Sequence, residues 1–220
     1  MSPQLAVIFD VDGVLTDSYR PHFRSWVRMF AEHGIEFTED AFRRTFGRTN
    51  RDILTTLYPG QLSDQQLRDW GARKELLYRE IIAREFEPMD GALELIDELH
   101  SAGFKLGVGS SGPPENIKLT LEKMARAEKI GAVVTGADVA RGKPDPQVFL
   151  LAAERLGVPT ARCAVVEDAP QGIEAANRAG MTSIALTGTA TRDELAHATL
   201  VVDRLTELTP QRIADLITTQ

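Results

Sequence analysis

The chain of 220 residues has a single cysteine, Cys163, so it can form no disulfide within itself. This thiol lies in the apolar run 163–166, which predicts a buried small side chain and fits a reducing, cytoplasmic location. No apolar run is long enough to cross a bilayer, and residues 1–4 lack the basic segment that opens an export signal. The sequence therefore predicts neither secretion nor a membrane anchor.

Positive charge is also scarce, because 25 Lys and Arg residues face 32 Asp and Glu residues and leave a formal net charge of -7. Such a surface repels nucleic acid and anionic lipid, so we expect no nucleic-acid and no membrane partner. Repeats and low-complexity tracts are absent, and 43% hydrophobic with 26% charged residues excludes a disordered or coiled-coil chain. The length suits one large domain or two small ones, and the sequence indicates no particular oligomeric state.

Short apolar runs rich in Val and Ile alternate with amphipathic segments; they cover residues 5–9, 104–108, 132–135, 163–166, 182–186 and 200–202. Runs that are apolar on both faces and joined by helices are typical of parallel strands in β-α-β units. The expected helix boundaries in this part of the chain are Asp90 and Gly103, Pro146 and Gly157, Gly180, and Thr209 with Pro210. The pattern predicts an α/β fold with one parallel sheet.

Between the first run and Pro88 the pattern changes, because amphipathic helices follow one another there without a strand-like segment. Residues 22–34 place one apolar stripe on a helix, made by Phe23, Trp26, Val27, Phe30 and Ala31. Further helix starts are expected at Thr38, at Asn50 and at the capping box formed by residues 63–66. We therefore predict a core domain of residues 1–15 and 87–220, with a helical domain of residues 16–86 inserted after the first strand.

The first strand ends in two acids, Asp10 and Asp12, followed by Gly13. Carboxylates at positions i and i+2 of a strand project to the same side, and open α/β sheets bind their ligands at the carboxyl ends of strands. Two like charges so close together require a counter-ion. By itself, however, an Asp-x-Asp-Gly string is equally consistent with an acidic turn or a calcium loop.

Three later segments add chemistry at the same sheet edge. Ser110 follows the second run and is succeeded by a helix opening, which offers a hydroxyl and backbone N–H groups to an anion. Lys143 lies in a proline-rich loop before a helix, and Glu167 with Asp168 ends the fourth run. Singly, these residues are consistent with an ordinary turn, a solvated lysine and a helix cap. Together with Asp10 they predict one site.

This set of residues suits phosphoryl transfer through a covalent aspartyl-phosphate. Mg²⁺ prefers oxygen ligands, which Asp10, Asp168 and Glu167 would supply. Asp10 would attack phosphorus, and Asp12, with a pKa raised by acidic neighbours and partial burial, would act as general acid and then general base. Two further residues, Lys143 and Ser110, would balance the charge and hold the phosphoryl oxygens.

The ordered set resembles the four motifs of the haloacid dehalogenase-like superfamily, over essentially the whole chain. It is most similar to the branch that includes β-phosphoglucomutase and many small-molecule phosphatases, in which a helical cap follows the first motif. The resemblance implies a Rossmann-like core with helices on both faces of the sheet, an all-helical cap, and Mg²⁺ as cofactor. It makes Asp10 the nucleophile, Asp12 the acid/base whose carbonyl also binds Mg²⁺, Ser110 and Lys143 the phosphate-binding pair, and Glu167 and Asp168 metal ligands.

Position 12 and the cap narrow the reaction. Family dehalogenases and phosphonatases lack the second aspartate, so the resemblance leaves a phosphatase or a phosphomutase. Residues 22–26 resemble the mutase cap, but Asn50 stands where the mutase has an arginine for the distal phosphate, although Arg48 or Arg51 would still supply charge. The mutase's second motif continues with serine and lysine, where this chain has Gly112 and Pro113. Both differences argue against a second phosphate-binding site, which a mutase requires and a hydrolase does not.

We therefore expect a Mg²⁺-dependent phosphatase that acts on small phosphomonoesters, with sugar phosphates as a candidate class. A β-phosphoglucomutase-type mutase is the alternative. The candidate substrate-binding residues are His22, Arg48, Thr49, Asn50, Ser111 and Gly112. A phospho-acceptor signalling domain also uses acids, a hydroxyl and a lysine at a sheet edge, but it has little use for Asp12 or for a large helical insertion. A catalytically silent binding protein is disfavoured because every catalytic residue type is present.

Overall fold

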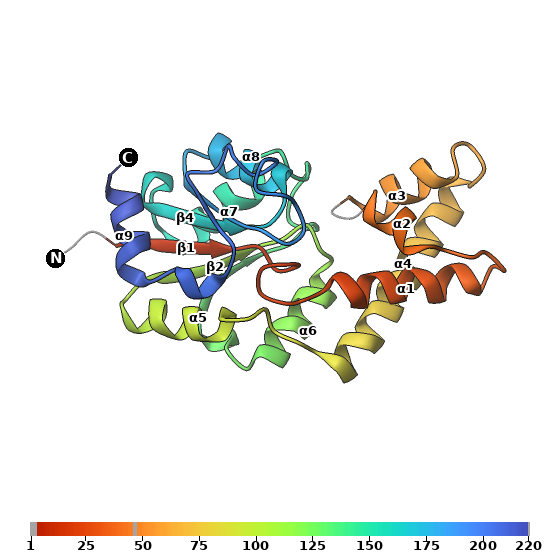
Figure 1. Ribbon diagram of the computed structural model, residues 1–220, viewed down its shortest axis with the longest axis horizontal. Coiled ribbons are helices and arrows are strands. Elements are labelled where there is room, and N and C mark those ends of the chain that lie inside the picture. The colour runs from red at the N-terminus through yellow and green to blue at the C-terminus, as the bar shows by residue number, and fades with distance from the viewer. Residues whose placement is uncertain (1–3, 46–47, 220) are drawn as a thin grey trace. The chain divides into compact units, whose positions relative to one another are not determined.

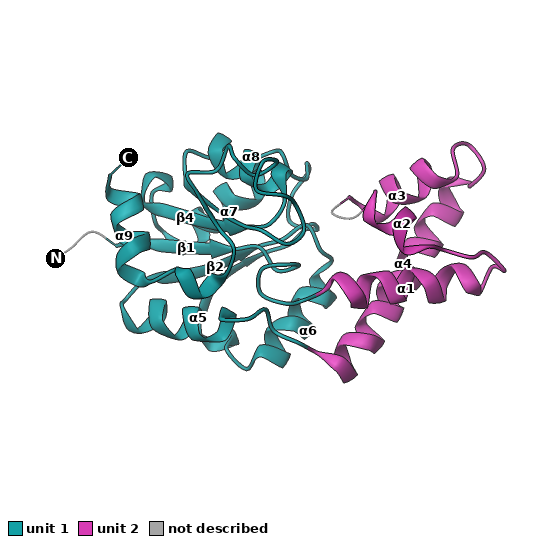
Figure 2. Ribbon diagram, viewed as in Figure 1, with its two compact units in different colours: residues 1–17, 87–220 teal, residues 18–86 magenta. Residues whose placement is uncertain are grey.

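The computed structural model describes residues 4–45 and 48–219. Figure 1 follows the chain from end to end, and Figure 2 colours its two compact units. One unit, called the core unit below, consists of residues 1–17 and 87–220. The other, called the helical unit, consists of residues 18–86. The chain leaves the core unit once and returns to it once.

The core unit is built on a six-stranded sheet in which all paired strands are parallel. The strands are β1 (Ala6–Phe9), β2 (Lys105–Gly109), β3 (Ile130–Val134), β4 (Cys163–Glu167), β5 (Thr182–Leu186) and β6 (Leu200–Val202), in the spatial order β3-β2-β1-β4-β5-β6. Strands β1, β4 and β5 are buried at every residue, which explains why β1 and residues 163–166 of β4 are continuously apolar rather than alternating. The predicted parallel α/β fold is confirmed.

Helices cover both faces of this sheet. Helices α7 (Gln147–Leu156) and α8 (Pro170–Arg178) lie on one face, and α5 (Ala92–Ser101) and α6 (Pro114–Met124) lie on the other (Figure 1). The last helix is α9 (Pro210–Thr218), and short 3-10 helices cover residues 127–129, 160–162 and 205–207. Because the strand order reverses next to β1, the carboxyl ends of β1, β2 and β4 border the crevice where such sheets bind ligands.

The helical unit contains α1 (Tyr19–Ala31), α2 (Glu39–Arg43), α3 (Asn50–Leu57) and α4 (Asp64–Glu85). Its core is rich in aromatic rings, including Trp26, Phe30, Phe37 and Phe42. The predicted stripe of α1 packs into this core except for Ala31, which is exposed at the end of the helix. In the described residues 4–45 and 48–219, no helix is both long and apolar enough to span a membrane.

Most predicted helix boundaries are confirmed, including the capping box that opens α4 and the left-handed Gly157 that closes α7. Two predicted caps are wrong. The N-cap of α5 is Gly91 rather than Asp90, because the chain turns there at φ 80 and a methyl group on this residue would lie 2.8 Å from a side-chain carbon of Thr206. The N-cap of α3 is Thr49 rather than Asn50, since the Thr49 hydroxyl accepts the backbone N–H of residue 52.

The two segments that link the units are hydrogen-bonded to each other. The backbone N–H of Asp17 donates to the carbonyl of Glu87 over 3.1 Å, and the Thr16 hydroxyl donates to the same carbonyl over 3.0 Å. One step further into the core unit, the N–H of Met89 donates to the carbonyl of Leu15 over 3.1 Å. The outgoing and returning chains therefore form a short ladder at the edge of the core unit.

Candidate active site

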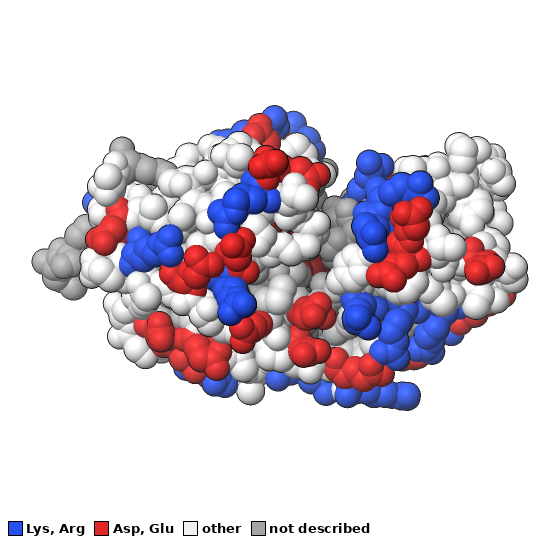
Figure 3. Space-filling model, viewed as in Figure 1, with Lys and Arg blue, Asp and Glu red and all other residues white. Residues whose placement is uncertain are grey.

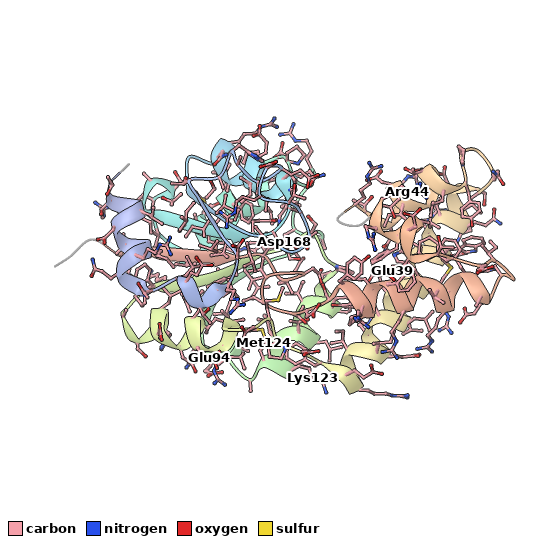
Figure 4. The ribbon with its side chains drawn as sticks, in the orientation of Figure 1. Glu39, Arg44, Glu94, Lys123, Met124 and Asp168 are labelled. Atoms are coloured by element: carbon pink, nitrogen blue, oxygen red, sulfur yellow. The ribbon has the colours of Figure 1, made fainter. Side chains whose placement is uncertain are left out.

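Four of the predicted site residues follow or end adjacent strands. Asp10 comes directly after β1, and Glu167 and Asp168 lie at the end of β4, which pairs with β1. Ser110 comes directly after β2, the other neighbour of β1. Figure 4 labels Asp168 at this end of the sheet. The topology thus brings together side chains that are up to 158 residues apart in the sequence.

Lys143 connects two of the acids. Its ammonium nitrogen donates to Oδ1 of Asp10 and to Oε1 of Glu167, each over 2.6 Å. The side chain is 9% exposed and its nitrogen lies 4.9 Å from the centre of the Phe149 ring. The loop that carries it is held by Gln147, whose side-chain oxygen accepts two backbone N–H groups of residues 140 and 141. Lys143 is therefore a fixed cation of the site and not a solvated surface lysine.

Glu167 is held from both of its carboxylate oxygens. Oε1 accepts Lys143, and Oε2 accepts the backbone N–H groups of Asp168 and Ala169 over 2.8 and 2.7 Å. The carboxylate lies against the backbone of Gly172 in α8, where a methyl group would come within 1.8 Å of Oε1. The sequence reasoning missed Gly172, because only the folded approach of α8 to β4 makes a side chain impossible there.

The carboxylate of Asp168 lies against the backbone of a second glycine, Gly13. A methyl group on Gly13, which has φ 75, would lie 2.0 Å from Oδ2 of Asp168 and 3.1 Å from the hydroxyl oxygen of Thr189. Gly13 therefore serves both the left-handed turn after Asp12 and the close approach of the carboxylate. Neither Gly13 nor Thr189 was among the predicted site residues.

Asp10, Glu167 and Asp168 form a buried acidic cluster. They are 7%, 1% and 4% exposed, and each offers a carboxylate oxygen within 4.8 Å of the oxygens offered by the other two. Full ionisation of these three acids beside the single positive charge of Lys143 would leave an excess of two negative charges in a place with little water. All the donors are oxygen atoms, which suit a hard divalent cation such as Mg²⁺. The residues present therefore fit the expected metal.

The pKa values of the site show how strongly these charges interact. Burial raises the pKa of Asp10 to about 7; the positive charge of Lys143 opposes this, and the charges of Glu167 and Asp12 add to it. The pKa of Asp168 is also raised, first by burial and then by Glu167 and Asp10. Burial would lower the pKa of Lys143, but the two bonded carboxylates outweigh it and raise the value. Lys143 is therefore charged, while the acids are poised to ionise fully only beside further positive charge.

Ser110, Gly112 and Asp12 form a second group in the core unit. The backbone N–H of Gly112 donates to Oγ of Ser110 over 3.1 Å. A methyl group on Gly112 would lie 3.4 Å from that oxygen and 3.9 Å from Oδ2 of Asp12, so the three residues adjoin one another. Ser110 is 2% exposed and Asp12 is half-buried, whereas Ser111 is exposed.

In the helical unit, two of the candidate residues meet a buried ion pair. The ammonium nitrogen of Lys74 lies 2.7 Å from Nδ1 of His22 and donates to Oε1 of Glu75 over 2.9 Å. The side-chain amide of Asn50 donates to the same Glu75 oxygen over 2.6 Å. Because an ammonium group can only donate, Nδ1 of His22 accepts, and its ring stacks on Tyr78 with the ring centres 4.0 Å apart.

The sequence reasoning missed Lys74 and Glu75, although a signal for Lys74 exists. Lys74 is 3% exposed and occupies a position on the buried face of α4, between Leu67 and Ile81, where the helical period calls for an apolar residue. Burial opposes ionisation of Glu75, but Lys74, His22 and Asn50 outweigh it and lower the pKa of this carboxyl. A charged pair is thus maintained inside the helical unit.

The remaining helical candidates have different surroundings. Asn50 and Glu75 line a pocket of about 280 Å³ between α3 and α4, together with Arg51, Leu67, Arg68, Gly71 and Ala72. Arg48 is exposed before α3. The Thr49 hydroxyl donates to Oδ2 of Asp52 over 2.7 Å and also caps α3, so its side chain has a structural role in the helical unit.

Residues 5–180 match the family described as haloacid dehalogenase-like hydrolase. The chain belongs to this family. It is an enzyme of this hydrolase family. The chain is 32% identical over 208 residues to validoxylamine A 7'-phosphate phosphatase of Streptomyces hygroscopicus subsp. limoneus. This match covers 91% of this chain and 94% of that protein. It is also 32% identical over 212 residues to β-phosphoglucomutase of Bacillus subtilis, covering 93% and 91%.

A solved structure agrees with this family assignment. The haloacid dehalogenase-like (HAD) hydrolase of family IA, variant 3, from Entamoeba histolytica superposes with a TM-score of 0.88 at 28% identity and covers 98% of this chain and 100% of its own. The relatives thus include a phosphatase and a mutase at equal identity.

Proposed function

We propose that the protein is a Mg²⁺-dependent phosphatase that hydrolyses small phosphomonoesters, with sugar phosphates as the preferred class, through an aspartyl-phosphate on Asp10. The observation that carries the proposal is the buried group in which Lys143 bridges Asp10 and Glu167 beside Asp168. A buried lysine that fixes two carboxylates, beside acids that ionise fully only with added positive charge, suits transfer of an anionic phosphoryl group next to a divalent cation.

Asp10, Glu167 and Asp168 would hold Mg²⁺, with the backbone carbonyl of Asp12 as a further ligand. When bound, the ion supplies positive charge that favours the ionised form of these acids and balances the charge of the phosphate. A carboxylate oxygen of Asp10 attacks phosphorus, and the bond from phosphorus to the ester oxygen breaks. Asp12 donates its proton to the leaving oxygen.

The second half of the reaction returns the enzyme to its starting state. Asp12, now a carboxylate, takes a proton from a water molecule that attacks the phosphorus of the aspartyl-phosphate, and Asp10 leaves as a carboxylate. Lys143 holds Asp10 in position and offsets negative charge in both steps. Ser110 accepts the N–H of Gly112 through a lone pair, so its hydroxyl proton can donate to a phosphoryl oxygen.

Residues of the helical unit support a hydrolase rather than a mutase. A mutase has to bind a second phosphate, for which a cationic side chain is the usual partner. Here the position of the expected arginine holds Asn50, and its amide donates to the ionised Glu75. The nearby Lys74 ammonium is already paired with Glu75 and His22, and Gly112 and Pro113 carry no charge on the core side, so neither position offers a second phosphate the cation that the mutase motifs provide. A β-phosphoglucomutase-type reaction is the second candidate because of the mutase relative.

We propose a small phosphorylated metabolite as the partner and the cytoplasm as the location. Basic and acidic side chains are interspersed over the face of the core unit visible in Figure 3, without a broad basic field of the kind that binds nucleic acid. The helical unit would select the substrate as a cap through His22, Arg48, Thr49 and Asn50, with Ser111 and Gly112 contributing from the core unit.

The proposal is tested by release of inorganic phosphate from a panel of sugar phosphates and other small phosphomonoesters, with Mg²⁺ and with chelator. We expect Mg²⁺-dependent release by the native protein and none by Asp10→Asn. Conversion of β-glucose 1-phosphate to glucose 6-phosphate is measured in parallel, with and without catalytic glucose bisphosphate. Isomerisation without net phosphate release would refute the phosphatase and support the mutase.

A further inference from the structure

We propose that Thr189 is a positioning residue of this site: its hydroxyl donates to the carboxylate of Asp168 and fixes the orientation in which that carboxylate meets a divalent cation. The inference rests on the proposed function for the presence of the cation. It adds a residue from a fifth segment of the chain, the loop between β5 and β6, which none of the predicted motifs includes.

The geometry around Gly13 places the two side chains together. The same hypothetical methyl group on Gly13 would touch Oδ2 of Asp168, Cγ of Asp168 and the hydroxyl oxygen of Thr189, at 2.0, 2.8 and 3.1 Å. Strand β5 pairs with β4, so the loop after β5 starts at the sheet edge where Asp168 lies. A side-chain hydrogen bond from Thr189 to Asp168 also acts on the pKa of this carboxyl, which it lowers against the stronger effect of burial.

The direction of the bond follows from the chemistry of the two groups. An ionised carboxylate has only acceptors, so the threonine hydroxyl must donate. The other site residues with the largest effects on Asp168 are Glu167 and Asp10, whose like charges repel it, and Lys143, whose nitrogen is bonded to those two acids. Thr189 is therefore a neutral donor that can favour one orientation of the carboxylate without competing for the cation.

The loop is anchored on both sides of Thr189. Before it, the hydroxyl of Thr187 donates to Oδ1 of Asp203 over 2.9 Å and its backbone N–H donates to the carbonyl of residue 202. After it, the hydroxyl and N–H of Thr191 both donate to Oε2 of Glu194, over 2.7 and 2.8 Å. A residue held between two such anchors loses little additional conformational freedom when its hydroxyl binds, which favours a positioning role.

The consequence is a specific effect on metal binding. Hydrogen-bond partners that orient a metal ligand commonly change metal affinity by about 10- to 100-fold when they are removed. Thr189→Val keeps the shape of the side chain and loses the donor, so we expect Mg²⁺ to bind about 10-fold more weakly. Thr189→Ser keeps the donor, and we expect Mg²⁺ affinity within about threefold of the native value.

The experiment titrates Mg²⁺ alone into the full chain, without substrate, by calorimetry and by the Mg²⁺-induced rise in Tm. The matched control is Thr135→Val, which removes a threonine-to-carboxylate hydrogen bond, to Asp138, from the loop after β3 and leaves the anchors of Thr189 intact. Each variant is also unfolded thermally in chelator, and Thr189→Ala serves as a second variant if the valine lowers Tm there. We expect weak Mg²⁺ binding only in the variants that lack the hydroxyl at position 189.

Native-like Mg²⁺ affinity in Thr189→Val and Thr189→Ala would overturn the inference and leave the proposed function intact. Failure of Thr189→Ser to restore affinity, or equal weakening in Thr135→Val, would also overturn it, because the effect would then not come from the Thr189 hydroxyl. If the native protein itself does not bind Mg²⁺, the proposed metal site fails, and the inference fails with it.

Discussion

Asp10 provides a test of the electrostatics that does not depend on turnover. Its pKa is about 7 in the folded protein against an ordinary value of 3.8, chiefly because the carboxyl is buried. Between these two values the folded state binds a proton that the unfolded state has released. Stability is therefore highest below the unfolded pKa and decreases as the pH rises through the folded one. The perturbation is Asp10→Asn, whose amide stays neutral at every pH.

The magnitude follows from the two pKa values. For a single carboxyl with pKa values of 3.8 and about 7, the free energy of unfolding decreases by about 2–3 kcal/mol between pH 5 and pH 8. In a chain of this size that corresponds to a decrease in Tm of about 5–10 °C. Asp10→Asn lacks this contribution, so the stability of the native protein relative to the variant should decrease by the same amount over that range.

The assay is urea or thermal unfolding of both proteins in chelator at several pH values, analysed as the difference between the two curves because other groups titrate in both proteins. Adding Mg²⁺ at the high-pH end should raise the Tm of the native protein, since the cation binds the ionised cluster, and should raise that of Asp10→Asn much less. A difference that stays constant from pH 5 to pH 8 would show that the Asp10 carboxyl is not forced toward its neutral form by burial.

Three further predictions concern packing, reactivity and capping. Gly172→Ala would drive a methyl group into Glu167 and should destabilise the fold by about 1–3 kcal/mol in thermal unfolding. The control Gly142→Ala, whose added methyl group would have nothing within 4 Å, should change Tm little, and equal effects of the two substitutions would contradict the packing argument. Burial raises the pKa of Cys163 to about 11, so a thiol reagent at neutral pH should label it only after unfolding in urea, and rapid labelling of the native protein would show that the thiol is accessible. Ser63→Ala removes the capping box of α4 and should reduce the unfolding free energy by about 1 kcal/mol; no change in urea unfolding would mean that the cap is not formed in solution.

The fold could be predicted because its signals are local. Parallel strands that are buried on both faces need consecutive apolar residues, so each run in the sequence lies within two residues of an observed strand. The same logic located Asp10, Ser110, Glu167 and Asp168, because the residues after parallel strands share one edge. Lys143 is harder to predict, because it lies nine residues after the end of β3 in the long loop before α7, and its role was inferred only together with the other motifs.

The missed residues depend on contacts between distant segments. Gly13 and Gly172 are required because a carboxylate from β4 approaches their backbones, and nothing near them in the sequence shows this. Gly91 replaces Asp90 as a cap because of its contact with Thr206, more than a hundred residues later in the chain. Glu75 was missed because its hydrogen-bond partner, Asn50, lies on another helix.

The ladder between residues 15–17 and 87–89 has a consequence for how this protein could diversify. The two connecting segments are already hydrogen-bonded to each other, so the helical unit between them is attached to the core unit as one closed insertion. An insertion attached in this way can be shortened, enlarged or exchanged without changing the length of any strand or the register of any pair in the sheet. New substrate preferences could therefore be acquired by altering one continuous stretch of sequence, while the chemical apparatus at the strand ends stays as it is.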